Sequence, residues 1–189
     1  MKLHLGCGKR DFGPDWISID GGSFPHLHSH NITKLEFEDN TVDLIYSSHV
    51  LEYFDRAEVL DVLNEWKRVL KPNGTLRLAV PDFEAMVKLY MNDEYGLDYF
   101  LGPLFGKMPM SDQTIFHKTV YDFESLKKTL EKVGFDDVKL YNWRETEHSH
   151  IDDHSQAYIP HMDKENGTLI SLNVESIKTI NYDNYDSNI

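Results

Sequence analysis

Three groups of small or polar residues in the first third of the chain could together hold a nucleotide-like ligand. Gly6 and Gly8 flank a cysteine after the apolar run KLHL, and without Cβ atoms they let a ligand approach the backbone amides. Asp20 ends the next apolar run, where its carboxylate can accept both hydroxyls of a ribose. The third group follows another apolar run and consists of Ser47, Ser48 and His49. If these runs are neighbouring parallel strands, the three groups meet at the carboxyl edge of one sheet.

Strand and helix patterns alternate along the chain in the way that such a sheet requires. Apolar, β-branched runs predict strands at residues 2–5, 16–20, 42–48, 75–82, 135–143 and 168–179. Helical spacing of apolar residues predicts helices at 55–70, 83–91 and 122–134, with caps at Asp55, Asp82 and Asp122. The alternation predicts an α/β fold, a three-layer Rossmann-like arrangement with a mostly parallel sheet. The last two strands, with no helix between them, predict an antiparallel C-terminal hairpin.

The connection between the first two predicted strands is too short for the usual crossover helix. Only 12 positions separate Gly8 from Asp20, and Gly13 and Pro14 lie between them. We therefore expect a shortened first crossover that leaves this side of the ligand more open than usual.

The chain is predicted to form a single domain over residues 1–180, with a loose polar tail at 181–189. Residues 93–121 carry glycines, prolines and aromatic residues without clear periodicity, which predicts a long loop or lid. Residues 143–167 form a His-rich insertion between the last two predicted strands.

Composition and charge exclude several classes of partner. The 189 residues carry a net charge of −13, and such a field repels the phosphate backbone of nucleic acids. No apolar stretch approaches the length of a membrane span, and no signal segment is recognisable. The single cysteine, Cys7, cannot form an internal disulfide. We expect a cytoplasmic protein with neither nucleic acid nor membrane as a partner.

Taken in order, the motifs of the chain resemble those of a known family. They are LHLGCG, WISID, FEDNTVDLIYSSHVLEYF, EWKRVLKPNGTLRLAVPD, HKTVYDFESLKKTLEKVGF and SLNVES. This series resembles the class I S-adenosylmethionine-dependent methyltransferase superfamily, and in particular a group of short bacterial and phage predicted methyltransferases. The resemblance spans roughly residues 2–178. It implies S-adenosylmethionine as the cofactor and S-adenosylhomocysteine as the product, whereas the substrates of this group are poorly known. Our leading hypothesis is a small-molecule or sugar-type acceptor, since the acidic charge argues against bulk nucleic acid, and a protein acceptor stays open.

The resemblance also assigns parts of the cofactor to particular positions. The implied cofactor-binding residues are Leu5, Gly6, Cys7, Gly8, Asp20, Asn31, Ile32, Ser47, Ser48 and His49. The first four would lie beside the methionine part and Asp20 would bind the ribose. Asn31 and Ile32 would lie at the adenine, and the last three would lie next to the methionine end and the acceptor.

Three positions depart from the usual pattern of the superfamily. His4 stands where an acid often anchors the methionine ammonium group, and Arg10 replaces the third glycine of the turn. Asn31 replaces the acid at the adenine, which its side-chain carbonyl could still bind without a charge. The missing acid at His4 and the shortened first crossover leave open a second hypothesis, in which the protein binds the cofactor or its product without transferring a methyl group.

Methyl transfer from a sulfonium depends mainly on aligning the donor with the acceptor, and a general base matters chiefly for a hydroxyl acceptor. His49, by its place near the methyl group, and His117, in the expected lid, are the candidate catalytic bases. Cys7 is interpreted as a small packed residue rather than a nucleophile.

The His-rich insertion leaves three interpretations open. Its candidate side chains are His148, His150, Asp152, Asp153, His154 and His161. Their spacing matches no known ligand frame, so no metal ligand is assigned, although a metal-dependent hydrolase is a third hypothesis for the function. The segment could instead line the acceptor pocket or form a solvated loop.

Overall fold

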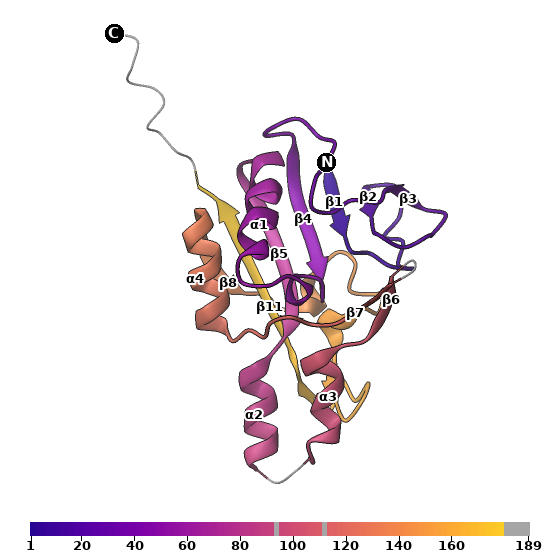
Figure 1. The fold of residues 1–189 in the computed structure, drawn as a ribbon, viewed down its shortest axis with the longest axis vertical. Coiled ribbons are helices and arrows are strands. Elements are labelled where there is room, and N and C mark those ends of the chain that lie inside the picture. The colour runs from indigo at the N-terminus through magenta and orange to yellow at the C-terminus, as the bar shows by residue number, and fades with distance from the viewer. Residues whose placement is uncertain (93–94, 111–112, 180–189) are drawn as a thin grey trace.

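A seven-stranded sheet forms the centre of the computed structural model, which describes residues 1–92, 95–110 and 113–179 (Figure 1). Its strands are β1 (Lys2–Leu5), β2 (Trp16–Ile19), β3 (Leu27–Ser29), β4 (Val42–Ser48), β5 (Leu70–Pro81), β8 (Phe135–Leu140) and β11 (Ser171–Lys178). They lie in the order β3-β2-β1-β4-β5-β11-β8. The pairs from β3 to β5 are parallel, and β11 runs antiparallel to both β5 and β8. The predicted mostly parallel sheet and the antiparallel pairing of its last two predicted strands are confirmed.

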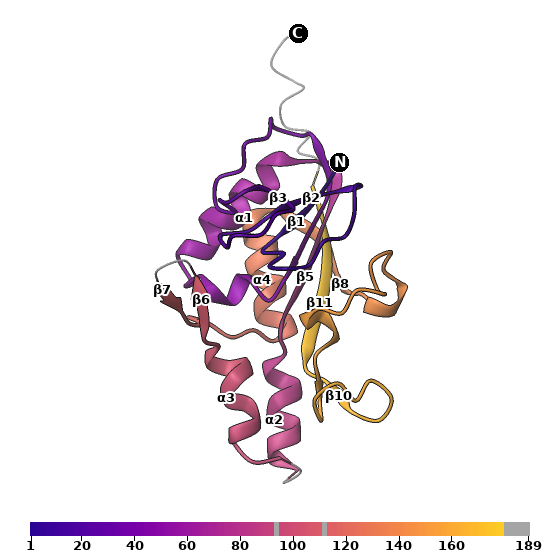
Figure 2. The same cartoon turned by 90° about the vertical axis from the view of Figure 1, so that its right-hand side faces the viewer.

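Two helices, α1 (Glu58–Val69) and α4 (Phe123–Val133), pack against each other and cover one face of the sheet (Figure 2). The apolar residues of α1 that recur at helical spacing are buried against the sheet, and Trp66 is completely buried. At the start of α4, Asp122 accepts the N–H of Ser125, whose hydroxyl in turn accepts the N–H of Asp122. The predicted cap of α4 therefore sets where this helix begins. The cap predicted for the other helix is wrong: α1 begins at Glu58 after Ala57, although Asp55 and Glu58 do accept each other's backbone N–H.

The opposite face of the sheet is covered by residues 141–167 (Figure 2). This segment contains two 3₁₀ helices (Trp143–Glu145 and His154–Gln156) and a short hairpin of β9 (Tyr158–Ile159) and β10 (Thr168–Leu169). The His154–Gln156 turn contacts both β5 and β11. The His-rich insertion thus provides part of the third layer of the fold.

The first crossover, residues 6–15, is described throughout and contains no helix, as its length predicts. Phe12 from this crossover lies between two histidine rings, 4.0 Å from the ring centre of His4 and 4.3 Å from that of His148. Leu3 and Leu5 belong to the core under α1, so the alternation of the strand directs His4 to the other face. Burial lowers the pKa of His4 well below its usual value and keeps the ring neutral. The histidine at the place of the usual acid therefore packs in an aromatic stack.

The segment predicted as a long loop contains regular structure on both sides of residues 111–112. It includes α3 (Asp98–Phe105) and a hairpin of β6 (Met108–Met110) and β7 (Gln113–Ile115). The strands are too short to show alternation in the sequence, and α3 contains Gly102 and Pro103, which argue against a helix. Together with α2 (Phe83–Met91), α3 extends beyond the end of the sheet (Figures 1 and 2).

Two remaining expectations concern the ends of the chain and the membrane. The tail expected at residues 181–189 lies outside the described residues. Among the helices that the structure describes, none has both the length and the apolar character needed to cross a membrane.

Candidate active site

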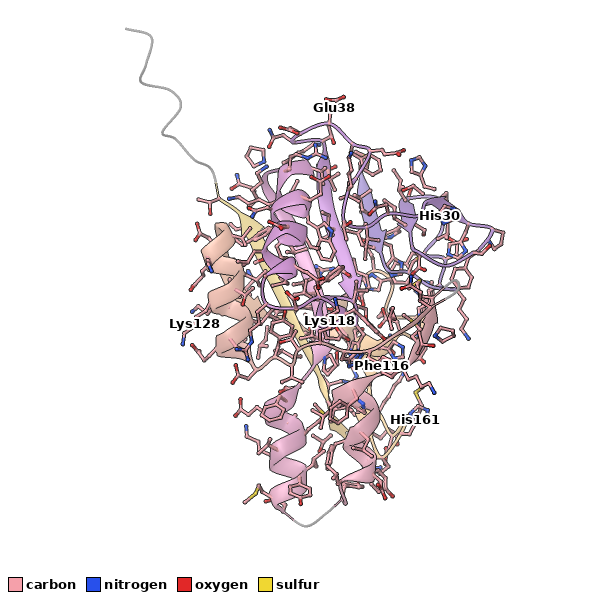
Figure 3. The ribbon with its side chains drawn as sticks, viewed as in Figure 1. His30, Glu38, Phe116, Lys118, Lys128 and His161 are labelled. Carbon is pink, nitrogen blue, oxygen red and sulfur yellow. The ribbon has the colours of Figure 1, made fainter. Side chains whose placement is uncertain are left out.

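A cavity of about 720 Å³ opens at the carboxyl ends of β1, β2 and β4, and the β6–β7 hairpin and the residues that follow it form its other wall. Figure 3 shows Phe116 and Lys118, which line the cavity, on the segment after β7, and His30, which also lines it, beside β3. The volume lies within the usual range for small-molecule sites. The predicted residues that line it are Gly6, Gly8, Asp20, Asn31, Ile32 and Ser48.

The two glycines of the β1 turn are required for different reasons. Both have a positive φ, +71° at Gly6 and +55° at Gly8, which favours glycine. A Cβ atom at Gly6 would lie 2.1 Å from a methyl carbon of Val50, so packing alone excludes a side chain there. A Cβ atom at Gly8 would meet no atom within 4 Å. Gly8 therefore leaves the backbone open to a ligand in the cavity.

Asp20 accepts hydrogen bonds from two loops at the edge of the cavity. One carboxylate oxygen accepts the backbone N–H of Gly8 at 2.8 Å, and the other accepts that of Gly22 at 2.7 Å. Each oxygen keeps further lone pairs, so the buried carboxylate can still accept hydroxyl groups of a ligand. The residue predicted to bind the ribose is thus also the residue that shapes the loops around it.

Asn31 lines the cavity, but its side-chain oxygen is used within its own turn. It accepts the N–H and the hydroxyl of Thr33, at 2.9 and 2.8 Å, and the N–H of Lys34 at 3.2 Å. The sequence suggested this oxygen as the acceptor for an adenine amino group. In the structure, the side-chain NH₂ of Asn31 is the group left for a ligand.

The two serines at the end of β4 differ in their environment. The hydroxyl of Ser47 donates to the carbonyl of Leu5 at 3.0 Å, which links β4 to β1, and does not line the cavity. Ser48 lines the cavity, and its buried hydroxyl has no hydrogen-bond partner within the described residues. A buried polar group without a partner is unfavourable, and a ligand in the cavity could supply that partner.

Leu5 and Cys7 are buried and lie behind the cavity wall. Burial, together with the nearby charge of Asp20, raises the pKa of the Cys7 thiol to about 12. The thiol therefore stays protonated at neutral pH, which agrees with its interpretation as a packed residue rather than a nucleophile.

The two candidate bases, His49 and His117, do not line the cavity and instead face the same buried carboxyl group. Glu52, in the 3₁₀ turn after β4, is fully buried, and neither of its side-chain oxygens has a hydrogen-bond partner in the described part of the chain. Its Oε1 lies 3.5 Å from Nδ1 of His49 and 3.7 Å from Nε2 of His117. Burial raises the pKa of Glu52 to about 8 and lowers the pKa of each histidine.

The hydrogen bonds around His117 fix where its proton lies. Nδ1 of His117 is 2.9 Å from the carbonyl oxygen of Pro103, which can only accept, so Nδ1 carries the proton of the neutral ring. Nε2, facing Glu52, is then an acceptor. The ring lies behind Tyr53, which lines the cavity, with 4.7 Å between the ring centres.

The same argument applies to His49. The hydroxyl of Ser171 donates to Oδ1 of Asn173 at 3.0 Å, so its oxygen is free to accept the N–H at Nε2 of His49, 3.2 Å away. Nδ1 of His49 is then also an acceptor facing Glu52. Two acceptor nitrogens thus face one carboxyl oxygen, and a proton on Glu52 is what relieves their repulsion.

The histidines of the insertion are separated from one another by the fold. His148 is buried in the stack with Phe12, and His150 and His161 are exposed. His154 lines the cavity, with its ring centre 5.2 Å from that of His49. Among the described residues, no group of three or more histidine, cysteine or acidic side chains is arranged to hold a metal ion. A metal-dependent hydrolase is therefore not favoured.

Sequence patterns assigned no role in the site to Arg10 or Glu52, whereas His154, named as a candidate of the insertion, does line the cavity. Arg10 and His154 line the cavity from the first crossover and the insertion. Arg10 stood out in the sequence only as a departure from the glycine pattern, and Glu52 was not singled out at all. Their meeting depends on contacts between segments far apart in the chain, which spacing along the sequence does not reveal.

Part of the sequence matches a described protein family. Residues 16–78, about a third of the chain, match the family described as a methyltransferase domain. The ubiquinone/menaquinone biosynthesis C-methyltransferase UbiE of Paraburkholderia phytofirmans is 33% identical over 115 residues, which cover 58% of this chain and 46% of that protein. This chain spans less than half the length of the curated relatives it matches.

Solved structures share the fold over nearly the whole chain. A SAM-dependent methyltransferase from Archaeoglobus fulgidus superimposes with a TM-score of 0.58 at 18% identity, covering 94% of this chain and 85% of that chain. A Burkholderia thailandensis 1,6-didemethyltoxoflavin-N1-methyltransferase, solved with that compound and S-adenosylhomocysteine, gives a TM-score of 0.53 at 12% identity, covering 95% and 71%. The chain therefore has the fold of the class I SAM-dependent methyltransferases. Its membership of the short bacterial and phage group stays a prediction.

Proposed function

We propose that the protein is an S-adenosylmethionine-dependent methyltransferase of the cytoplasm. The observation that carries this proposal is the cavity at the carboxyl ends of β1, β2 and β4, in a fold that places Gly8, Asp20 and Ser48 on its wall. The match of residues 16–78 to a methyltransferase domain and the shared fold support it.

The residues present on the wall fit the parts of this cofactor. Asp20 would accept the ribose hydroxyls, and Asn31 and Ile32 would border the adenine. The open backbone at Gly8 and the unpartnered hydroxyl of Ser48 would receive the methionine end. S-adenosylmethionine supplies a methyl group that is already activated by the sulfonium. The chain's own task is to hold the acceptor in line with the methyl group and to exclude water.

We further propose a small-molecule or sugar-type acceptor rather than a nucleic acid. The net charge of −13 disfavours a polyanionic acceptor. The wall that faces the strand ends is largely apolar and includes Met108, Ile115 and Phe116. His49 and His117 have both ring nitrogens directed at other groups, so their part would be to position neighbouring residues unless the cluster around Glu52 rearranges.

Calorimetric titration with S-adenosylmethionine and S-adenosylhomocysteine tests the proposal. We expect both to bind, and we expect Asp20→Ala to weaken binding by about 1–3 kcal/mol, because ribose hydroxyls lose their acceptor. Asp15→Ala, an exposed acid in the same crossover, is the matched control and should bind like the wild type.

The absence of binding in the wild-type protein at millimolar ligand would overturn the proposed function. Unchanged affinity in Asp20→Ala would remove only the assignment of the ribose to this residue. Binding without transfer to any acceptor in a broad panel would favour the alternative of a silent cofactor-binding protein.

A further inference from the structure

Arg10 places a permanent positive charge on the cavity wall without a carboxylate to balance it. Its Nε donates to the carbonyl oxygen of Asp152 at 2.8 Å, which holds the side chain against the insertion. Within the described residues, no acidic side chain lies within 4.0 Å of the guanidinium, and its two terminal nitrogens have no hydrogen-bond partner. The guanidinium is half-buried and has two free nitrogens, in a chain with 32 acidic residues. It can therefore bind an anion of a ligand.

Lys118 provides the comparison on the same wall. Its ammonium group pairs with Glu58 at 2.7 Å, so its charge is already neutralised within the protein. Of these two positive charges on the cavity wall, that of Arg10 is therefore the one still available for a ligand.

The position of Arg10 identifies the end of the cavity at which the anion would bind. It follows the β1 turn and contacts the insertion next to His154, whose ring lies beside that of His49 at the end of β4. Burial is the main cause that lowers the pKa values of His49 and His154, and the charge of Arg10 is a smaller cause at both. Asp20 and Asn31 lie instead on the side of β2 and β3.

We infer that Arg10 is the binding site for the α-carboxylate of the methionine half of the cofactor, which rests on the proposed function. A nucleoside with its ribose on Asp20 and its base near Asn31 directs its amino-acid arm toward β1 and β4. That arm ends in a carboxylate, which pairs with a guanidinium through two parallel hydrogen bonds. His4 offers no charge to the ammonium group, since it is neutral and buried in the stack on the other face. Recognition of the amino-acid arm therefore depends on its carboxylate.

Two matched ligands and two variants test the assignment by calorimetry. S-adenosylmethionine and its decarboxylated form differ by the carboxylate alone. We expect the wild type to bind the first about tenfold to a hundredfold more tightly than the second, the range for charge-assisted hydrogen bonds. In Arg10→Gln, the two affinities should become equal, mainly because S-adenosylmethionine binds less tightly. Arg10→Lys should keep part of the preference, and Lys9→Gln, an exposed neighbour, should keep all of it.

Each possible outcome supports or overturns the inference. A wild type that binds both ligands equally overturns it without any variant, so a folding defect in Arg10→Gln does not obscure the test. An unchanged preference in Arg10→Gln also overturns it. Equal weakening of both ligands, with the preference intact, shows that Arg10 acts on the shape of the cavity and not on the carboxylate. A wild type that binds neither ligand instead overturns the proposed function.

Discussion

At Ser48, a role in ligand binding can be measured separately from a role in folding. Because it has no partner among the described residues, its removal in Ser48→Ala should change the free energy of unfolding by less than about 0.5 kcal/mol. A bound cofactor would satisfy the hydroxyl, so the same variant should bind S-adenosylmethionine several-fold less tightly, about 1 kcal/mol. Urea unfolding and calorimetry on one preparation measure both quantities.

The neighbouring Ser47 is the matched control for this prediction. Its hydroxyl bonds to the carbonyl of Leu5 and lies outside the cavity. Ser47→Ala should therefore lose about 1 kcal/mol of stability and keep its affinity. If Ser48→Ala also destabilises the free protein and binds normally, Ser48 has a structural role only.

Individual residues at strand ends could be predicted from the sequence, whereas residues that meet through the fold could not. Gly8, Asp20 and Ser48 each directly follow or end an apolar run, and that place in the sheet decides their position at the cavity. Arg10 and Glu52 are different. Arg10 is held by the backbone of Asp152, which lies 142 positions further along the chain. No local pattern records such a contact.

At the scale of elements, Glu52 joins the end of β4 to the segment that follows β7. Its backbone carbonyl accepts the N–H groups of Lys118 and Thr119, and its side chain faces His49 and His117. A protonated Glu52 can donate to either histidine, while an ionised one places a third acceptor among them. The segment that lines the cavity is therefore best held when Glu52 carries a proton.

Glu52→Gln tests whether a proton on Glu52 stabilises the fold, because glutamine can donate to the histidines and does not titrate. The folded pKa of about 8 lies above the unfolded value near 4.5. The stability from the proton is therefore complete below about pH 4.5 and is lost as the pH rises through 8. Between pH 5 and 8 the wild type should lose about 3 kcal/mol relative to Glu52→Gln in urea unfolding.

The exposed Glu36→Gln serves as the control for Glu52→Gln, and its stability should stay parallel to that of the wild type over this range. A constant difference between the wild type and Glu52→Gln from pH 5 to 8 would show that Glu52 is ionised in the folded protein and has found another partner.

Most of the longer elements were predicted, but β5 begins at Leu70 instead of residue 75, and the strand predicted at 168–179 is divided into β10 and β11. The strands of three residues were not predicted. Strand β4 and helix α2 have the predicted bounds, because their runs and caps are long enough to give a clear pattern. Strands β3, β6 and β7 have three residues each, too few for alternation to show, and their pairing depends on the neighbouring segment.

At the scale of the whole molecule, residues 141–167 and the short first crossover form the third layer, on the face of the sheet opposite α1 and α4. Here the cover includes the rings of His4, Phe12 and His148, with Tyr46 also in contact with His148. The stability of this layer therefore depends on keeping histidines neutral.

The pH at which the whole fold weakens follows from these histidines. Burial lowers the pKa of His4, His49, His117, His148 and His154, so their stabilising effect is present above about pH 6.5 and is lost as the pH falls.

For His148 the pKa is about 4, which corresponds to a loss of about 2 kcal/mol between pH 8 and 5. His148→Phe keeps a flat ring against Phe12 without a titratable group. The variant should lose about 2 kcal/mol less than the wild type over this range in urea unfolding. The exposed His161→Gln should follow the wild type. Parallel curves for His148→Phe and the wild type would mean that the stack opens to water and that the insertion does not seal this face of the sheet.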